Sequence, residues 1–473
     1  MIRHTLNYFL SKGLPGLINF LAIAVYTRLL SPNEYGEYAL IIASVSMMSS
    51  FFFHWLRMGL LRFNPKYQTS NRTIFLSSIA VAFISLLFSS LLIGISIFFV
   101  ASDVRALSTM WFLGLGLLTV QSIYDIFLEL IRSELKSKLY GLITSIKVTG
   151  SLILSVLFIK MGFGSSGIII GLMIGMLLSI LFILPNHVKG IRLEQADMSL
   201  IKEIVLYSLP FAATLSMEYI FLTSDRFVIS FFLGTAETGI YAVSYDLAKQ
   251  ILMMIMMIIN LAAYPLVVKA LETSGIEASQ KQLNMNTTFL LLVSLPAAAG
   301  MILLCKPFTE IFLGSEYQGS TSIIFAFVTF SILLQGFKIY YFDLAFQLGR
   351  RTSLQIWPVL ISAIVNIGLN FFLVPKYGIL GSAYSTIFSC GLAIFISSMI
   401  GKRIFPLTFP LKEALKITAS VAVMCFALLP LLHTDGVFYF AVQIGIGVIS
   451  YSLMILLLNV AGFQKLLAVR LKR

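Results

Sequence analysis

Charged side chains are scarce in this chain of 473 residues: Asp, Glu, Lys and Arg make up 11% of it, against 59% for hydrophobic residues. Soluble globular proteins carry about 25% charged residues. The mean hydropathy is +0.96. These values exclude a water-soluble globule, and they predict an integral membrane protein.

Cysteine and histidine are also rare: the chain has three cysteines and four histidines. Cys305, Cys390 and Cys425 fall in separate apolar runs, so the sequence contains no disulfide framework and no metal-ligand spacing. It also lacks a P-loop, which argues against an ATP-driven pump, and it shows no catalytic constellation. We therefore expect no metal, no cofactor and no enzymatic activity.

Long apolar runs are abundant. About 20 consecutive apolar residues suffice to cross a bilayer as a helix. Because unpaired backbone groups are costly in lipid, such runs are expected to be helical. The sequence thus predicts an all-α integral membrane protein with about 14 transmembrane helices. They are expected at residues 14–30, 38–58, 74–100, 107–129, 141–159, 166–185, 204–232, 239–267, 286–304, 321–347, 355–373, 379–400, 415–432 and 437–461.

The net charge of +13 is best explained by membrane topology. If the predicted segments alternate across the membrane, most Lys and Arg residues lie on the side of the two termini. Cytoplasmic loops are enriched in these residues. The asymmetry predicts that both termini are cytoplasmic, and it makes nucleic acid an unexpected partner. The residues left on the opposite side are Arg28, Arg105, Lys160, Lys306 and Lys376.

Residues 204–250 combine two predicted spans with five ionisable side chains: Glu218, Asp225, Arg226, Asp246 and Lys249. A charge within hydrocarbon costs several kcal/mol unless it meets a partner or a water-filled cavity. Several such residues at similar depth indicate a polar path through the membrane. This pattern favours a transport protein.

The sequence also contains an internal repeat. The pattern E-x-G-x-Y occurs at 34–38 and again at 237–241, each time shortly after a span that begins with Leu-Pro and ends near an Arg. An even number of spans per copy gives parallel repeats, as in several transporter families. We expect a six-helix lobe at 1–190, a second six-helix lobe at 191–405 and two additional helices at 406–473.

Five segments in order resemble the polysaccharide transport family of the multidrug/oligosaccharidyl-lipid/polysaccharide exporter superfamily. They are TRLLSPNEYGEYAL (27–40), YSLPFAATLS (207–216), SDRFVISFFLGTAETGIYAVSYDLAK (224–249), FLGSEYQGS (312–320) and VNIGLNFFLVPKYGILGSAYST (365–386). The resemblance covers almost the whole chain.

The resemblance implies two six-helix lobes around a central cavity. It also implies a secondary-active flippase that moves undecaprenyl-diphosphate-linked oligosaccharide from the cytoplasmic to the periplasmic leaflet of the bacterial inner membrane by alternating access. Such a flippase would serve the synthesis of O-antigen lipopolysaccharide, capsule or exopolysaccharide. Its partners would be the anionic glycolipid, membrane lipids, and a polysaccharide polymerase with its chain-length machinery.

An anionic diphosphate headgroup needs cations along its path, because they replace its lost hydration. Arg28 and Arg226 occupy comparable places in the two repeats, so they are the first candidates for substrate binding. The further basic candidates are Lys249, Lys338 and Lys147. Each has a structural alternative, such as an ion pair or a side chain that reaches toward the membrane surface.

Glu218, Asp225, Asp246 and Asp343 are the candidates for coupling export to an ion gradient, since a carboxylate in a low-dielectric cavity can bind and release a proton. The alternative is that each of them balances a cation.

Pro15 and Pro210 begin corresponding helices of the two repeats and are the candidate hinges. In contrast, Gly167, Gly171 and Gly175 recur every four residues, a spacing typical of close helix packing.

Two other functions stay open. The first is a multidrug cation and ion antiporter of the same superfamily, which would need an acidic binding region. The second is a membrane-embedded polysaccharide polymerase or glycosyltransferase. The absence of a large polar loop argues against the second.

Overall fold

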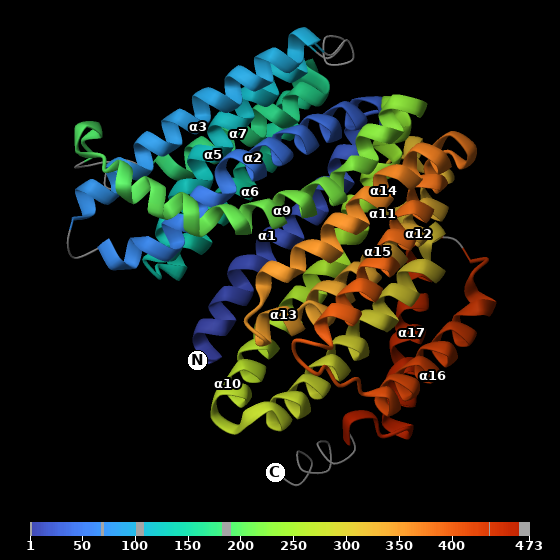
Figure 1. Cartoon of the computed structure of the whole chain (residues 1–473). Helices are drawn as coiled ribbons and strands as arrows, with labels where there is room; N and C mark the ends of the chain where they lie inside the picture. The colour runs from blue at the N-terminus through green and yellow to red at the C-terminus, as the bar shows by residue number, and fades with distance from the viewer. Residues whose placement is uncertain (1, 68–70, 101–107, 182–190, 435, 463–473) are drawn as a thin grey trace. The chain divides into compact units, whose positions relative to one another are not determined.

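The computed structural model describes residues 2–67, 71–100, 108–181, 191–434 and 436–462, with side chains for all of these except 2–12, 14, 210–215, 320 and 461. The described segments are helical or lie in short connections, and they contain no strand (Figure 1). The chain divides into two compact units, residues 1–242 and residues 243–473. We call them the N-terminal unit and the C-terminal unit.

The described part of the N-terminal unit contains seven long helices and the first turns of an eighth. They are α1 (Ile2–Leu29), α2 (Pro32–Tyr67), α3 (Arg72–Val100), α5 (Ser108–Ser133), α6 (Ser137–Phe158), α7 (Gly164–Leu181), α9 (Met198–Leu233) and the start of α10 (Thr235–Leu303). Asp197 caps α9 by accepting hydrogen bonds from Ser199, and these bonds hold the pKa of the Asp197 carboxyl below its usual range.

The C-terminal unit contains the rest of α10 and the helices that follow it. These are α11 (Cys305–Phe312), α12 (Ser320–Phe337), α13 (Leu344–Leu348), α14 (Ile356–Tyr377), α15 (Ile379–Gly401), α16 (Leu411–Leu428) and α17 (Val437–Leu457). A π-helical turn, η4 (Lys338–Phe342), connects α12 to Asp343 and α13. Such turns insert one extra residue and often occur at functional sites.

Ten helical segments in the described residues are long and apolar enough to cross a membrane. Two of them, Ser137–Leu181 and Thr235–Leu303, break at a glycine with positive φ, Gly162 and Gly275, so each holds two passes. With α1 and α9 added, the predicted fourteen passes are accounted for. The all-α membrane fold is therefore confirmed.

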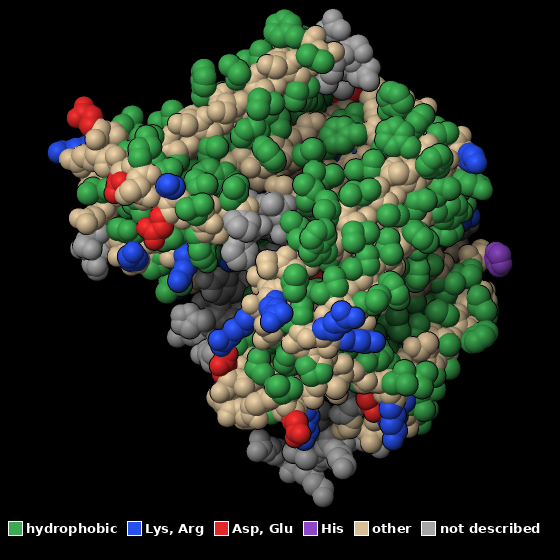
Figure 2. All heavy atoms as spheres, viewed as in Figure 1, with side chains coloured by type: hydrophobic (Ala, Val, Ile, Leu, Met, Phe, Trp, Pro, Cys, Tyr) green, Lys and Arg blue, Asp and Glu red, His purple; other side chains and the backbone are tan. Residues whose placement is uncertain are grey.

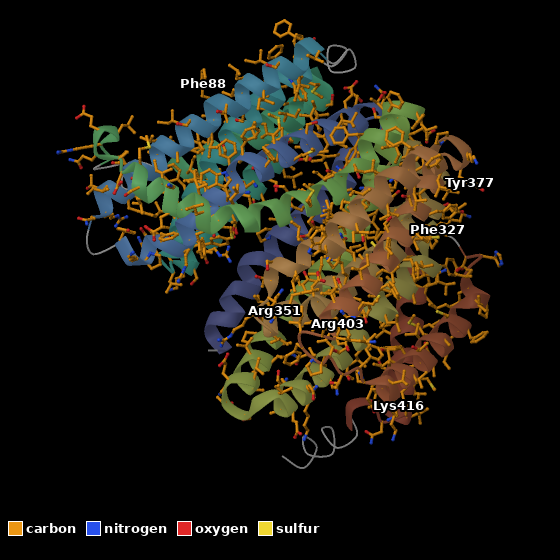
Figure 3. The ribbon with its side chains drawn as sticks, in the orientation of Figure 1. Phe88, Phe327, Arg351, Tyr377, Arg403 and Lys416 are labelled. Carbon is orange, nitrogen blue, oxygen red and sulfur yellow. The ribbon has the colours of Figure 1, made fainter. Side chains whose placement is uncertain are left out.

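The surface of both units is that of a lipid-embedded protein. Figure 2 shows hydrophobic side chains over most of the viewed face, with few charged ones. Phe88 on α3 is 69% exposed, and Phe372 and Phe426 are similarly open. In the C-terminal unit, Arg351 and Arg403 lie toward one end and Tyr377 toward the other (Figure 3). Arg and Tyr residues at the ends of an apolar belt are expected of a protein that spans a bilayer.

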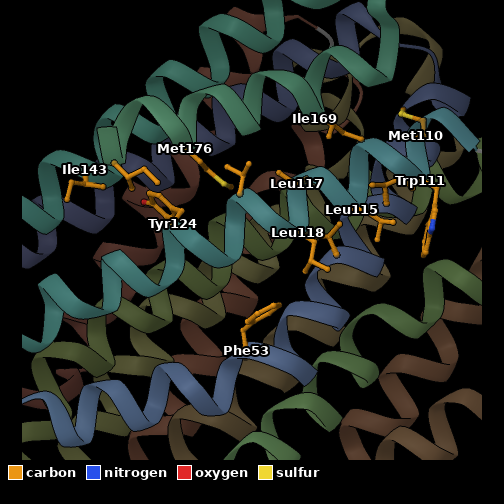
Figure 4. Close-up of a cluster of buried hydrophobic side chains, with 14 of the residues drawn as sticks. Phe53, Met110, Trp111, Leu115, Leu117, Leu118, Tyr124, Ile143, Ile169 and Met176 are labelled. Atoms are coloured by element: carbon orange, nitrogen blue, oxygen red, sulfur yellow. The ribbon is translucent and has the colours of Figure 1, made fainter. Parts of the chain in front are cut away.

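The core of the N-terminal unit lies where α5 packs against α2, α6 and α7. Leu117, Leu118, Tyr124, Ile143 and Met176 are buried there in one cluster (Figure 4). Tyr124 is the polar member of this set. The next residue in the chain, Asp125, forms an ion pair with Arg57 on α2.

The Gly167, Gly171 and Gly175 stripe packs against α6, as predicted. A Cβ at Gly171 would lie 2.5 Å from the Ser155 backbone nitrogen, and one at Gly175 would lie 2.7 Å from that of Ser151. Only glycine permits this approach of two helices.

The two E-x-G-x-Y segments contact each other within the N-terminal unit. A Cβ at Gly36 would lie 1.8 Å from the Thr235 carbonyl oxygen, and a Cβ at Gly239 would lie 1.9 Å from that of Pro32. In each case the glycine lies four residues after the start of its own helix and meets the start of the other. The sequence repeat is thus a structural pair, and both glycines are required for backbone contact.

The boundary between the compact units, at 242/243, lies further along the chain than the predicted lobe boundary at 190/191. Helix α9 packs against α2, and Gly239 packs against Pro32, which explains why residues up to 242 cluster with the N-terminal unit. The division into lobes at 1–190, 191–405 and 406–473 stays a prediction.

Candidate functional site

The predicted site residues lie on helices of both units. In the N-terminal unit, Arg28 is exposed in the last turn of α1, Lys147 is half-buried on α6, and Glu218 is half-buried on α9. Asp225 and Arg226 follow on α9 and are 2% and 7% exposed. Pro15 lies inside α1, whereas the side chain of Pro210 lies outside the described residues.

Asp225 is held by a tyrosine of the repeated segment. The hydroxyl of Tyr241 donates a hydrogen bond of 2.5 Å to Asp225 Oδ2, and both groups are buried. Tyr241 is the tyrosine of the second E-x-G-x-Y pattern, so the repeat positions an acid that the sequence marked for ion coupling.

In the C-terminal unit, Asp246 and Lys249 are half-buried on α10 and lie one helical turn apart. The Lys249 ammonium lies over the Tyr245 ring, 5.6 Å from its centroid. An aromatic face stabilises a cation in surroundings with few water molecules.

Lys338 and Asp343 form an ion pair in the C-terminal unit, with a distance of 2.7 Å between Nζ and Oδ2. The π-helical turn η4 makes the pair possible: the Asp343 N–H donates to the Lys338 carbonyl five residues earlier. A side chain at this spacing would lie on a different face of a regular α-helix.

Asp343 has further partners that complete its hydrogen bonding. Gln355 Nε2 donates to Oδ2 and Ser397 Oγ donates to Oδ1, each at 3.0 Å. The side chains of Lys338 and Asp343 are 8% and 1% exposed. Removing either member of such a buried pair would leave the other charge without compensation, which is strongly destabilising.

A second ion pair, which the sequence did not predict, lies in the N-terminal unit. Arg57 Nη1 on α2 donates to Asp125 Oδ2 on α5 at 2.5 Å, and the two side chains are 17% and 19% exposed. Lys147 lies over the Tyr124 ring at 4.8 Å from its centroid and is within electrostatic range of Asp125. We call His54, Arg57, Tyr124, Asp125 and Lys147 the Arg57 cluster.

The hydrogen bond between Arg57 and His54 fixes the histidine tautomer. Arg57 Nη2 lies 3.0 Å from His54 Nδ1. Because a guanidinium group only donates, Nδ1 must accept, and the ring carries its proton on Nε2. His54 is therefore a neutral imidazole with an N–H directed away from Arg57.

Three polar atoms of the Arg57 cluster are buried without a hydrogen-bond partner among the described residues: His54 Nε2, Arg57 Nε and the Tyr124 hydroxyl. All three can donate a hydrogen bond. With two cations and one carboxylate, the cluster has more donors and more positive charge than its own acceptors can satisfy. Such a set of groups can bind an anion.

The sequence indicated only Lys147 of this cluster. Arg57 lies at the end of the second predicted span, 38–58, so it was not marked as a charge within the membrane, but α2 continues to Tyr67. The pair with Asp125 joins residues 68 positions apart, so no local pattern marked it. The long amphipathic continuation of α2 was the one signal available.

Helices α14 and α15 form an uncharged polar contact. Asn366 Nδ2 lies 3.3 Å from Ser385 Oγ, and Ser385 Oγ donates to the Asn366 carbonyl at 2.9 Å. Interhelical hydrogen bonds of this kind stabilise packing within membranes. In the described part of the chain, no group of three His, Cys, Asp or Glu side chains could hold a metal ion.

Comparison with known proteins gives a family and a fold. A family model described as polysaccharide biosynthesis protein matches residues 25–322, which is more than half of the chain. No curated protein matches the sequence.

Among solved structures, one titled "Lipid II flippase MurJ, inward closed conformation" is similar with a TM-score of 0.74 and 19% identity, covering 97% of this chain and 99% of that chain. An inward-facing multidrug resistance MATE family transporter of the MOP superfamily is similar with a TM-score of 0.63 and 14% identity, covering 84% and 97%. A MOP superfamily transporter from Pyrococcus furiosus, whose title reports reversed polarity of its binding pocket, gives a TM-score of 0.53 and 14% identity, covering 85% and 94%.

Proposed function

Because the chain belongs to the polysaccharide biosynthesis protein family, we propose that it is a flippase for a lipid-linked saccharide. The family resemblance inferred from the sequence is confirmed, as is the multi-pass membrane fold shared with transporters of the MOP superfamily. The proposed cargo is an undecaprenyl-diphosphate-linked oligosaccharide used to build a surface polysaccharide.

The observation that carries the proposal is the placement of cations inside apolar helices. Lys147, Arg226 and Lys249 lie within the helical bundles, and Arg57 adds a further cation that the structure places beside Asp125. A flipped glycolipid must move a diphosphate through hydrocarbon, so its route needs cations that replace water. Arg is suited to phosphate oxygens because its guanidinium group binds two of them at once.

The roles of the individual residues are part of the proposal. Arg28, Arg226, Lys249 and Lys147 would contact the headgroup, whereas the Lys338 ammonium already has Asp343 as its counter-ion. Glu218, Asp225 and Asp246 would couple export to an ion gradient, whereas Asp343, also a predicted coupling acid, serves in this proposal as the counter-ion of Lys338. Bending at Pro15 and Pro210 would accompany alternating access.

The proposed location is the bacterial inner membrane with both termini in the cytoplasm. A polymerase and chain-length machinery would consume the flipped unit. In this account the protein moves its substrate without changing a covalent bond, so it is not an enzyme.

A multidrug cation antiporter is the second candidate, because the fold is also shared with multidrug transporters. A cationic drug needs an acidic binding region. The Arg57 cluster instead pairs two cations with one carboxylate, which favours an anionic cargo.

The experiment is reconstitution of the full chain into liposomes that carry a polyprenyl-diphosphate-linked oligosaccharide. Translocation is measured by the access of an external glycosidase to the sugar. We expect protein-dependent exposure of the sugar, and no exposure with empty liposomes. Export of a cationic dye without glycolipid movement would favour the multidrug candidate, and sugar transfer by the protein would favour a polymerase or glycosyltransferase.

A further inference from the structure

The Arg57 cluster contains its own counter-ion, the Asp125 carboxylate, which pairs with Arg57. Asp125 presents one carboxylate to Arg57 and lies within electrostatic range of Lys147. Three donors around it, on His54, Arg57 and Tyr124, have no partner in the described structure. A single carboxylate cannot satisfy this set, but a phosphate group with three oxygens can engage several of its members.

We propose that the Arg57 cluster is a phosphate-binding site in which the cargo displaces Asp125, and that the displaced carboxylate takes up a proton. This inference rests on the proposed function, because the phosphate is that of the lipid-linked cargo. It assigns to Asp125, a residue outside the predicted coupling acids, the role of linking headgroup binding to protonation.

The proton step follows from the surroundings of Asp125. While Arg57 pairs with it, the guanidinium group favours the charged form of the carboxylate. Once a phosphate binds the guanidinium group, Asp125 loses its direct partner in a partly buried position, and the charged form is less favoured than in the ion pair. The carboxylate then binds one proton from water and becomes a carboxylic acid; no other bond is made or broken.

Other ionisable groups face Asp125 from the surrounding helices. Glu129 is engaged by Arg132 at 3.1 Å, and His54 already accepts from Arg57. Helix α7 carries no ionisable side chain, and Arg72 of α3 pairs with Glu134. The ionisable groups that act on Asp125 or on its neighbours are His54 and Arg57 on α2, Tyr124 and Glu129 on α5, Tyr140 and Lys147 on α6, and Glu218 and Tyr219 on α9.

The exposure of the pair supports exchange. The side chains of Arg57 and Asp125 are 17% and 19% exposed, so the pair is partly accessible and mostly covered. Access allows an incoming oxygen to reach Arg57, and the partial burial makes the exchange of counter-ions energetically significant.

The test is calorimetric titration of the full chain in detergent with geranylgeranyl diphosphate at about pH 7. Running it in two buffers with different ionisation enthalpies gives the number of protons bound per ligand. Because the diphosphate itself titrates, the measured quantity is the difference between the wild type and Asp125→Asn. We expect the wild type to take up about one proton more than the variant.

Affinity supplies the second measurement. Asp125→Asn removes the competing charge and is expected to tighten diphosphate binding by about tenfold, whereas Arg57→Gln should weaken it by at least about tenfold. Glu413→Gln, which alters an ion pair with Lys416 in the C-terminal unit, is the matched control and should change neither quantity. Geranylgeraniol, which lacks the phosphates, should bind without a proton difference.

Further outcomes distinguish bilayer lipid from the cargo as the source of the phosphate. They also distinguish failure of the proposed function from failure of the role assigned to Asp125. If phosphatidylglycerol binds as tightly as the diphosphate and with the same proton uptake, the site belongs to bilayer lipid, and the assignment to cargo is overturned. If the wild type binds no diphosphate, the proposed function itself fails. Binding that is unchanged in Arg57→Gln, or equal proton uptake in the wild type and Asp125→Asn, overturns only the present inference.

Discussion

Two ion pairs among the described residues, Lys338–Asp343 in the C-terminal unit and Arg57–Asp125 in the N-terminal unit, each join a cation to an aspartate but lie in contrasting surroundings. Asp343 accepts from Lys338, Gln355 and Ser397, and its side chain is 1% exposed. Asp125 accepts from Arg57 at a site where other donors have no partner and both side chains stay partly exposed. The comparison separates a pair that holds helices together from one that can exchange its counter-ion.

The largest effect on stability is expected at the sealed pair. Asp343→Asn leaves the Lys338 ammonium buried without a counter-ion, and such a change costs about 3–5 kcal/mol of unfolding free energy. Thermal unfolding of the purified variant in detergent measures it. A variant as stable as the wild type would show that water or another group reaches Lys338, and the contrast between the two pairs would disappear.

Removing both charges of that pair should restore most of the stability. Lys338→Met combined with Asp343→Leu replaces the pair by apolar side chains of similar volume, a change that is often neutral. We expect glycolipid translocation to persist in this double variant. Loss of translocation with normal folding would instead support the predicted roles of Lys338 in substrate binding and of Asp343 in ion coupling.

At the partly exposed pair of Arg57 and Asp125 we expect a small effect on stability and a large effect on binding. Arg57→Gln is expected to cost only about 1–2 kcal/mol of stability, because the pair is partly solvated. It should nevertheless weaken diphosphate binding by at least about tenfold. Melting temperature and binding affinity measured on the same preparation test this, and a large loss of stability with intact binding would reverse the assignment.

A smaller effect is expected at His54. His54→Phe keeps a ring of similar size but removes the Nε2 donor and the acceptor for Arg57. The loss of one hydrogen bond of about 1 kcal/mol corresponds to about a fivefold weaker affinity. Titration with the same diphosphate measures it, and unchanged affinity would remove His54 from the phosphate-binding set.

The smallest effect is expected at Glu413, which pairs with Lys416 one helical turn away at 3.2 Å. Both side chains are 26% exposed, so Glu413→Gln should change stability by about 0.5 kcal/mol or less. Thermal unfolding again provides the measurement. A larger change would mean that partial exposure does not separate weak pairs from strong ones in this protein.

The sequence predicted the features that depend on local pattern. Apolar runs marked the helices, and the spacing of Gly167, Gly171 and Gly175 marked a helix contact that the structure confirms. Glycines at 36 and 239, found as a repeated pattern, turned out to contact each other's helix starts. In each case a short local pattern marked the residues, although the contact between the segments around Gly36 and Gly239 was not itself predicted.

The sequence could not predict pairs that form across the fold. Arg57 and Asp125 lie 68 positions apart, and nothing in either segment marks the other. Lys338 and Asp343 are five residues apart, a spacing that only the π-helical turn makes productive. A charged residue in a membrane helix either pairs with another group or faces a polar cavity. The roles of these residues therefore could not be assigned before their partners were known.

The most direct test of the central claim compares two variants in liposomes loaded with a polyprenyl-diphosphate oligosaccharide. We predict that Arg57→Gln loses most glycolipid translocation, while the double variant Lys338→Met with Asp343→Leu retains it. If the Arg57 variant translocates at the wild-type rate, and the double variant is folded but inactive, the headgroup does not depend on the N-terminal cluster and the account is contradicted.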